Sequence, residues 1–101
     1  MKAIDYAAKF FRQAIRTDLD HIQLAHLCAI GAGLDNDLDI ARFLGYTNEQ
    51  TVSRILSKLS RAEYITWKKD SFSEIRIYTL LPKGKETLKQ LLSFLPVKAK
   101  P

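Results

Sequence analysis

Apolar residues recur at helical spacing over the first third of the chain. Ile4, Ala7, Phe11 and Ile15 follow one another at intervals of three or four residues, which predicts a helix over about 3–16. The apolar residues of the next segment cover most of a helical circumference. A second helix is therefore expected there, at the centre of the core.

Capping and turn residues divide the chain that follows. Asp18 or Asp20 is expected to cap the second helix, because a short carboxylate accepts hydrogen bonds from the free N–H groups of the first turn. The glycines within 31–33 are expected to end it. A short third helix is predicted over 37–44, with its end at Gly45.

A fourth helix is predicted over 47–62. Its apolar residues fall at the spacing i, i+3, i+4 and i+7 and form one buried stripe: Val52, Ile55, Leu56 and Leu59. Thr47 and Gln50, three residues apart, are the expected capping box at its start.

After residue 63 the hydrophobic period changes from helical to two. Two runs rich in β-branched and aromatic residues, 64–67 and 75–79, flank a polar segment, which predicts a β-hairpin with a charged tip. Trp67 is expected in the core. Pro82 begins a last helix, which is expected to stop at Pro96.

This order of elements indicates a winged helix-turn-helix, an α+β and mainly helical fold with a two-stranded β-hairpin wing. Residues 1–101 are expected to form one domain, with a flexible tail over about 97–101. In such a fold the helix after the turn lies in the major groove of DNA, so 47–62 is the expected recognition helix. The hairpin over 66–76 is the expected wing, lying on the DNA backbone.

Composition narrows the class of protein. The 47% hydrophobic content is that of a globular domain, and no apolar run approaches the ~20 residues that cross a bilayer. The start of the chain does not have the pattern of a signal peptide, and its single cysteine, Cys28, is expected to be a buried structural thiol. These features predict a cytoplasmic protein with no membrane partner.

The net charge of +5 is unevenly distributed. Residues 1–46 carry five basic and six acidic side chains, whereas residues 47–101 carry eleven basic and five acidic ones. A basic half of this kind favours a polyanionic partner.

The polar face of the predicted recognition helix suits DNA. It combines Gln50, Arg54, Ser57 and Arg61, and no carboxylate lies on it. Arginine bonds guanine bidentately and glutamine bonds adenine, while hydroxyl groups and lysine bind phosphates. The twelve residues expected to contact DNA lie on this helix and the wing: Thr47, Asn48, Gln50, Thr51, Ser53, Arg54, Ser57, Lys58, Arg61, Lys68, Lys69 and Arg76.

Three segments resemble a known family of bacterial regulators. They are Asp39-Ile40-Ala41-Arg42-Phe43-Leu44-Gly45, Thr51-Val52-Ser53-Arg54-Ile55-Leu56-Ser57-Lys58-Leu59 and the Leu80–Leu88 run with its Lys83-Gly84 pair. This pattern, over about 19–92, is most similar to the multiple-antibiotic-resistance regulator (MarR) family. The arginine typical of that family's wing tip falls on Ser73 or Glu74 here.

The resemblance implies a homodimeric transcriptional regulator that binds palindromic double-stranded DNA, and we expect it to act as a repressor. A small-molecule effector is left open. The expected dimer interface consists of apolar residues in the first and last helices: Phe10, Phe11, Leu91, Leu92, Phe94 and Leu95.

Residues that suggest other chemistry have simpler explanations. His21 and His26 lie five apart, which is not metal-binding spacing, and Asp35, Asp37 and Asp39 are expected to cap a helix. We expect that the protein is not an enzyme and that it holds no metal or cofactor.

Two alternative functions stay open: a DNA-binding accessory protein for plasmid or phage replication, partition or recombination, and a protein-interaction winged helix.

Overall fold

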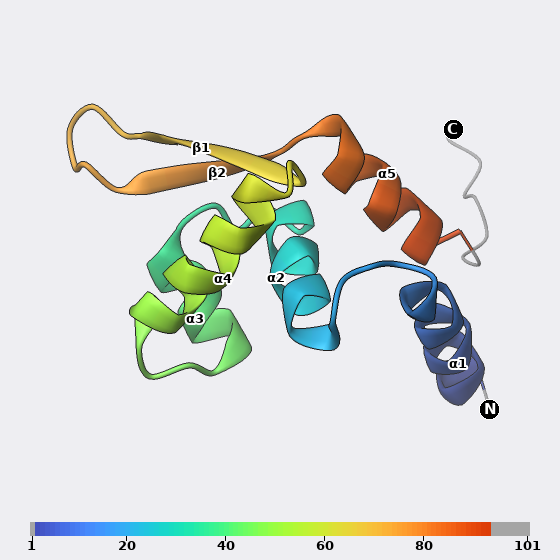
Figure 1. Cartoon of the computed structure of the whole chain (residues 1–101). Helices are drawn as coiled ribbons and strands as arrows, with labels where there is room; N and C mark the ends of the chain where they lie inside the picture. The colour runs from blue at the N-terminus through green and yellow to red at the C-terminus, as the bar shows by residue number, and fades with distance from the viewer. Residues whose placement is uncertain (1, 94–101) are drawn as a thin grey trace, which may run out of the picture.

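The computed structural model describes residues 2–93, which fold as five helices and one β-hairpin (Figure 1). The elements in chain order are α1 (Lys2–Ile15), α2 (His21–Gly31), α3 (Asp37–Leu44), α4 (Glu49–Arg61), β1 (Ile65–Lys69), β2 (Arg76–Leu80) and α5 (Pro82–Leu91). The predicted winged helix-turn-helix is confirmed. The expected tail over 97–101 lies outside the described residues.

The centre of the core is α2, as its all-round apolar sequence predicts. Leu27 and Ala29 are almost completely buried, and α2 contacts α3, α4, α5 and β2. The N-terminal cap of α2 is Asp20, whose carboxylate accepts from the Gln23 N–H at 2.7 Å. The Gln23 side chain bonds back to the Asp20 N–H at 3.0 Å, which completes a capping box.

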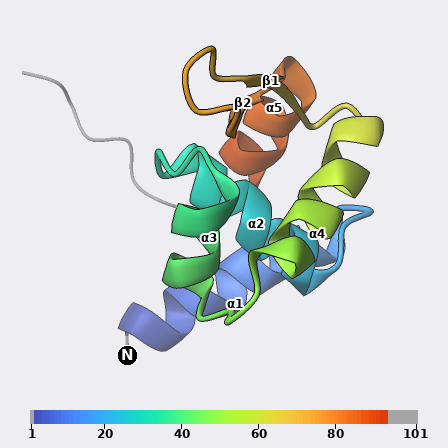
Figure 2. The same ribbon diagram turned by 90° about the vertical axis from the view of Figure 1, so that its left-hand side faces the viewer.

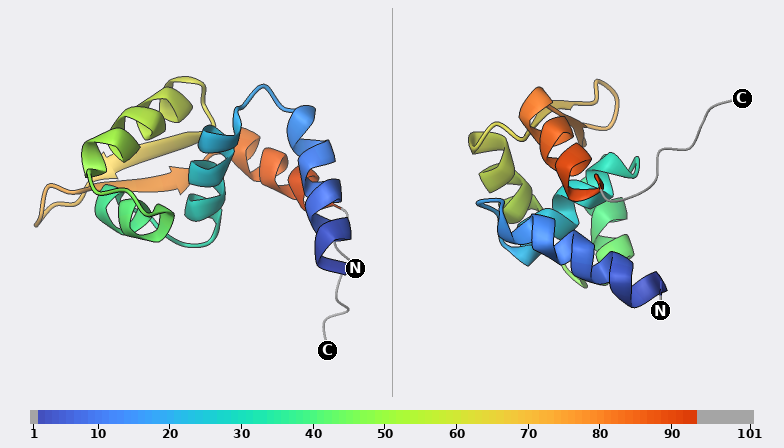
Figure 3. Two further views of the ribbon diagram at one scale, coloured as in Figure 1. Left: turned by 90° about the horizontal axis from the view of Figure 1, so that it is seen from below. Right: turned by 90° about the vertical axis from the view of Figure 1, so that its right-hand side faces the viewer.

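A second, smaller core joins α1 to α5. Ala14, Leu24 and Leu91 are buried there together. In the left view of Figure 3 α1 lies beside α5 at the end of the molecule opposite the hairpin. The last helix ends at Leu91, before the predicted stop at Pro96.

The turn between α3 and α4 confirms one predicted signal and corrects another. Gly45 closes α3 in the left-handed conformation, with φ of 84°. Thr47 was the expected cap of α4, but the cap is Asn48, whose side chain accepts from the Gln50 N–H at 2.8 Å. The helix therefore spans Glu49–Arg61 rather than 47–62, because asparagine is the stronger capping residue and stands one position later.

The hairpin pairs β1 and β2 antiparallel, with Ile65 opposite Leu80 and Lys69 opposite Arg76. Trp67 lies opposite Tyr78, and it shares a face with buried Ile65 because the two are two residues apart on β1. The expectation that Trp67 is in the core is nevertheless wrong, since 37% of it is exposed. At this level the core covers Tyr78 on β2, whereas the indole ring of Trp67 on β1 is covered by the Arg76 guanidinium at 4.3 Å.

Within residues 2–93 the chain has no helix with the length and apolar character needed to span a membrane.

Candidate nucleic-acid interface

The helix α4 is fixed by one side and presents the other to solvent. Val52, Leu56 and Leu59 are completely buried in the main core, which sets the rotation of the helix about its axis. The exposed residues on the opposite side carry long polar or charged side chains: Gln50, Arg54, Lys58 and Arg61. Between them, Thr51, Ser53 and Ser57 are partly buried, and Thr47 and Asn48 are exposed in the turn before the helix.

The hairpin lies on the same side of the molecule as the first turns of α4. In Figure 2 its loop, α3 and α4 face the viewer, with α1 behind them. A groove between them is lined by Gln50 and Ser53 of α4 and by Glu74, Ile75 and Arg76 of the hairpin. A partner lying along α4 therefore meets the hairpin as well.

The three basic residues of the hairpin point in different directions. Lys69 and Arg76 are opposite one another on the face of Trp67, whereas Lys68 pairs with Ile77 on the other face. Both lysines are exposed, and Arg76 is partly buried against Trp67. Arg76 is thus pre-positioned by its stacking contact, while the lysines extend freely into solvent.

A carboxylate organises the tip of the hairpin. One oxygen of Asp70 accepts from the Ser73 hydroxyl at 2.9 Å, the Ser73 N–H at 3.1 Å and the Phe72 N–H at 3.3 Å. Hydrogen bonds from Ser73 and Phe72 lower the pKa of this carboxyl group. Glu74 closes the loop in the left-handed conformation, with φ of 59°.

The groove between α4 and the hairpin carries acidic residues that the sequence pattern did not place there. The prediction concerned the polar face of α4 alone, and beside Gln50 this groove is lined by Asp37, Asp39, Glu49 and Glu74. Three of these acids come from α3 and the hairpin, outside α4, and Glu49 stands at the start of the helix. The basic side chains of α4 begin further along the helix, with Arg54.

Asp35, Asp37 and Asp39 were expected to cap α3, but none of them is its cap residue. The cap is Asn36, whose side-chain oxygen accepts from the Asp39 N–H at 2.9 Å and whose amide donates to the Asp39 and Asp35 carboxylates. No group of three or more potential ligands within residues 2–93 is placed to hold a metal ion.

Tyr78 joins the hairpin to the start of α3. Its N–H donates to the Asp35 carbonyl at 2.8 Å, and its ring is almost completely buried. Burial and the nearby Asp37 carboxylate raise the pKa of Tyr78 to about 12, while Arg76 acts in the opposite direction. The wing is thereby fixed in position relative to the helix-turn-helix.

Two residues that set the angle of the wing were not among the expected site residues. Gly84 allows α5 to approach the Tyr64 carbonyl, where a Cβ atom would overlap the oxygen. Lys83 places its ammonium over the Tyr64 ring at 4.4 Å and donates to the Ala62 carbonyl at 3.0 Å. The Lys83-Gly84 pair in the sequence was the signal that could have identified them.

The residues expected at the dimer interface differ in how far they are exposed. Phe10 and Phe11 line an apolar hollow of about 820 Å³ between α1, α2 and α3, and Phe11 and Leu92 are exposed. Leu91 is fully buried inside the chain and offers no surface. Phe94 and Leu95 lie outside the described residues.

Cys28 also lines the apolar hollow. It was expected to be buried but is half-buried, and this burial raises the pKa of its thiol.

Comparison with known proteins decides the type of fold. No protein-family model matches the sequence, and no curated protein matches it. Solved structures do match. A MepR variant from S. aureus bound to an oligodeoxyribonucleotide superposes with a TM-score of 0.77 at 23% identity, over 92% of this chain and 70% of that one. The fold is the MarR-type winged helix.

Two further structures have the same MarR-type winged helix. The transcriptional regulator Tm0710 from Thermotoga maritima has a TM-score of 0.79 at 15% identity, over 90% of this chain and 65% of that one. MarR from E. coli has a TM-score of 0.72 at 13% identity, over 90% of this chain and 68% of that one. The chain thus spans about two thirds of the length of these structures.

Proposed function

We propose that this chain is a transcriptional repressor that binds double-stranded DNA in a sequence-specific manner and catalyses no reaction. The main support is the geometry of α4. Val52, Leu56 and Leu59 of its apolar stripe are completely buried and Ile55 is partly buried, so the side with Gln50, Arg54 and Arg61 is held outward at a defined rotation. A MarR-type winged helix bound to an oligodeoxyribonucleotide is among the similar structures.

The distribution of charge suggests which side chains of α4 and the hairpin contact bases and which contact phosphates. The basic side chains of α4, which are Arg54, Lys58 and Arg61, do not line the acidic groove. The hairpin adds two further basic side chains, Lys68 and Lys69. We expect Gln50 and Arg54 to bond base edges, because they are long side chains near the start of α4. The lysines contact phosphates.

The proposal is tested by selecting a site from a random duplex library and measuring its dissociation constant over a salt series. Log affinity falls with log salt by about 0.9 per phosphate neutralised. Replacing Arg54 by Ala weakens binding to the selected site by roughly 1–3 kcal/mol. Arg12→Ala is the matched control, because Arg12 is exposed on α1, away from α4.

Two results would contradict the proposal. Absence of binding at low salt would favour the protein-interaction alternative, for which the acidic groove offers a surface. Equal loss from Arg54→Ala and Arg12→Ala would show that binding depends on overall charge rather than on α4. The position of the selected site, at a promoter or at an origin, separates a repressor from an accessory protein of replication or partition.

We also propose that two copies associate through α1 and α5. Ile4, Phe11 and Ile15 on α1 and Leu92 after α5 are large apolar side chains exposed in the single chain. Sedimentation at micromolar concentration should give the mass of a dimer, and Phe11→Ser should shift it towards the monomer. A monomer throughout would refute this arrangement.

A further inference from the structure

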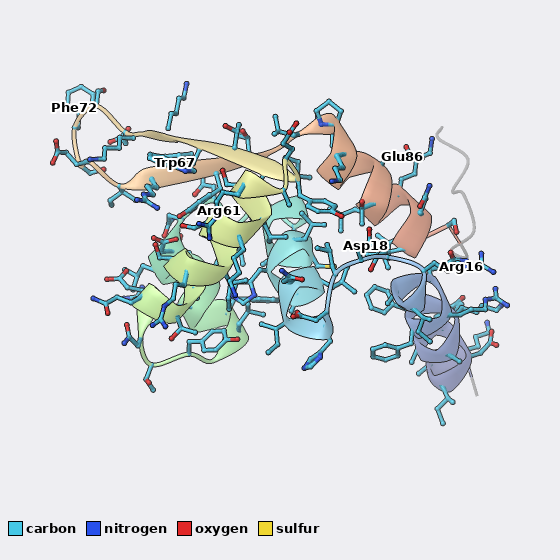
Figure 4. The ribbon with its side chains drawn as sticks, viewed as in Figure 1. Arg16, Asp18, Arg61, Trp67, Phe72 and Glu86 are labelled. Carbon is cyan, nitrogen blue, oxygen red and sulfur yellow. The ribbon has the colours of Figure 1, made fainter. Side chains whose placement is uncertain are left out.

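One aromatic side chain of the hairpin is almost entirely exposed to solvent. Phe72 is 95% exposed at the far end of the loop, where Figure 4 shows its ring beyond the ends of β1 and β2. An apolar ring in this position does not stabilise the described fold. Its surface is available to a partner.

The tip holds Phe72 in a defined place. The Asp70 carboxylate accepts from the Phe72 and Ser73 N–H groups and from the Ser73 hydroxyl, and the Asp70 N–H donates to the Ile75 carbonyl at 2.8 Å. These bonds close the loop beneath the ring. A ring carried on an ordered turn loses little conformational entropy when it binds.

The reach of the hairpin fits a duplex that lies on α4. Two residue steps separate Trp67, which lies opposite buried Tyr78, from Lys69, which is about 7 Å of strand, and the loop continues further. In both Figure 1 and the left view of Figure 3 the tip projects past α3 and α4. Half a turn of DNA, roughly 17 Å, separates a major groove from the minor groove beside it.

Charge at the tip also favours DNA. Lys68, Lys69 and Arg76 lie along the two strands near Phe72 and outnumber the two acids of the loop, Asp70 and Glu74. The Asp70 charge is directed into the turn by its three hydrogen bonds. Basic side chains around an apolar ring suit a surface of phosphates around stacked bases.

We propose that Phe72 is an apolar wedge, which enters the minor groove beside α4 and partly unstacks one base step. This inference rests on the proposed function. Insertion of an apolar side chain kinks the duplex towards the major groove. Pyrimidine–purine steps such as TA unstack most easily, so Phe72 selects such a step at a position that α4 does not read.

The test uses the full chain and the duplex selected with it. Energy transfer between dyes on the two duplex ends measures the bend, and 2-aminopurine at the step beneath the wing reports unstacking. The variants are Phe72→Ala, Phe72→Leu, which keeps an apolar wedge, and Ser71→Ala as the control at an exposed neighbouring position.

We expect wild type, Ser71→Ala and Phe72→Leu to bend the duplex and raise 2-aminopurine fluorescence. Phe72→Ala should lose both signals, bind about 5- to 150-fold more weakly and no longer prefer TA over a stiff A-tract at that position.

Three outcomes would overturn the wedge. If Phe72→Ala bends the duplex as the wild type does, the ring does not enter it. If that variant instead changes only the sedimenting mass, Phe72 contacts a second copy of the chain. If the wild type binds no duplex, the proposed function fails, and the wedge fails with it.

Discussion

Replacing Gly84 by alanine should destabilise this protein, although the same change in a helix usually stabilises by about 0.5–1 kcal/mol. Gly84 is buried in the first turn of α5, against the end of β2 and the residue before β1. A methyl group there would overlap the carbonyl oxygen of Tyr64 and lie 3.2 Å from Leu80 Cδ2. The Tyr64 oxygen belongs to the backbone, so no side-chain rotation can make room for the methyl group.

The size of the effect follows from what must move. To clear the carbonyl, α5 has to retreat by about 1 Å, which is overpacking of a kind that costs roughly 1–3 kcal/mol. The retreat also stretches the bond from the Leu81 N–H to the Tyr64 carbonyl, now 3.0 Å. For a chain of this size, about 4–8 °C per kcal/mol gives a midpoint roughly 5–20 °C lower.

Thermal and urea unfolding followed by circular dichroism measure this change. Lys85→Ala is the matched control, because Lys85 is the exposed neighbour of Gly84 in the same helical turn. Its free energy of unfolding should stay within about 0.5 kcal/mol of wild type. A Gly84→Ala protein as stable as wild type would refute the argument that this close approach sets the junction of wing and α5.

Three further predictions concern stability and ionisation. Asn48→Ala should cost about 1 kcal/mol in urea unfolding through loss of the α4 cap, whereas Thr47→Ala should cost much less; the reverse order would restore Thr47 as the cap. Burial lowers the pKa of His26, so protonation favours the unfolded chain, and the melting temperature should fall as pH drops below about 6.5. His26→Leu should flatten that dependence and His21→Gln, at an exposed position, should not. The raised pKa of Tyr78, about 12, means that stability falls as pH rises above 10; ultraviolet titration should show one late phenol that Tyr78→Phe removes.

Most helices and the hairpin were predictable because their signals are local. The start of α3 at Asp37 and its end before Gly45 follow from apolar periodicity and a left-handed glycine. The central position of α2 follows from its apolar circumference, which no surface helix has. Both signals lie within a few residues of the structure that they predict.

The errors arose where two signals competed or where distant segments meet. Thr47 and Asn48 are both capping residues, and only the path of the chain from Gly45 selects Asn48. Trp67 has the alternation of a core residue, but at its level the core covers only its partner Tyr78 and leaves Trp67 half-exposed under Arg76. An alternation pattern gives the face of a strand and not the distance to which the core extends beneath it.

The candidate interface also has features that the sequence determined and features that only the tertiary structure decided. The sequence alone determined that α4 has one buried and one polar side and that its exposed bases include Arg54 and Arg61, since a period of 3.6 is enough to separate the two sides. Only the tertiary structure decided that acids from α3 and the hairpin lie beside Gln50 and that Phe72 stands uncovered at the tip. Both depend on how the hairpin lies over the helices. That placement is set by long-range contacts, of Gly84 with Tyr64 and of Tyr78 with Asp35, which no local pattern encodes.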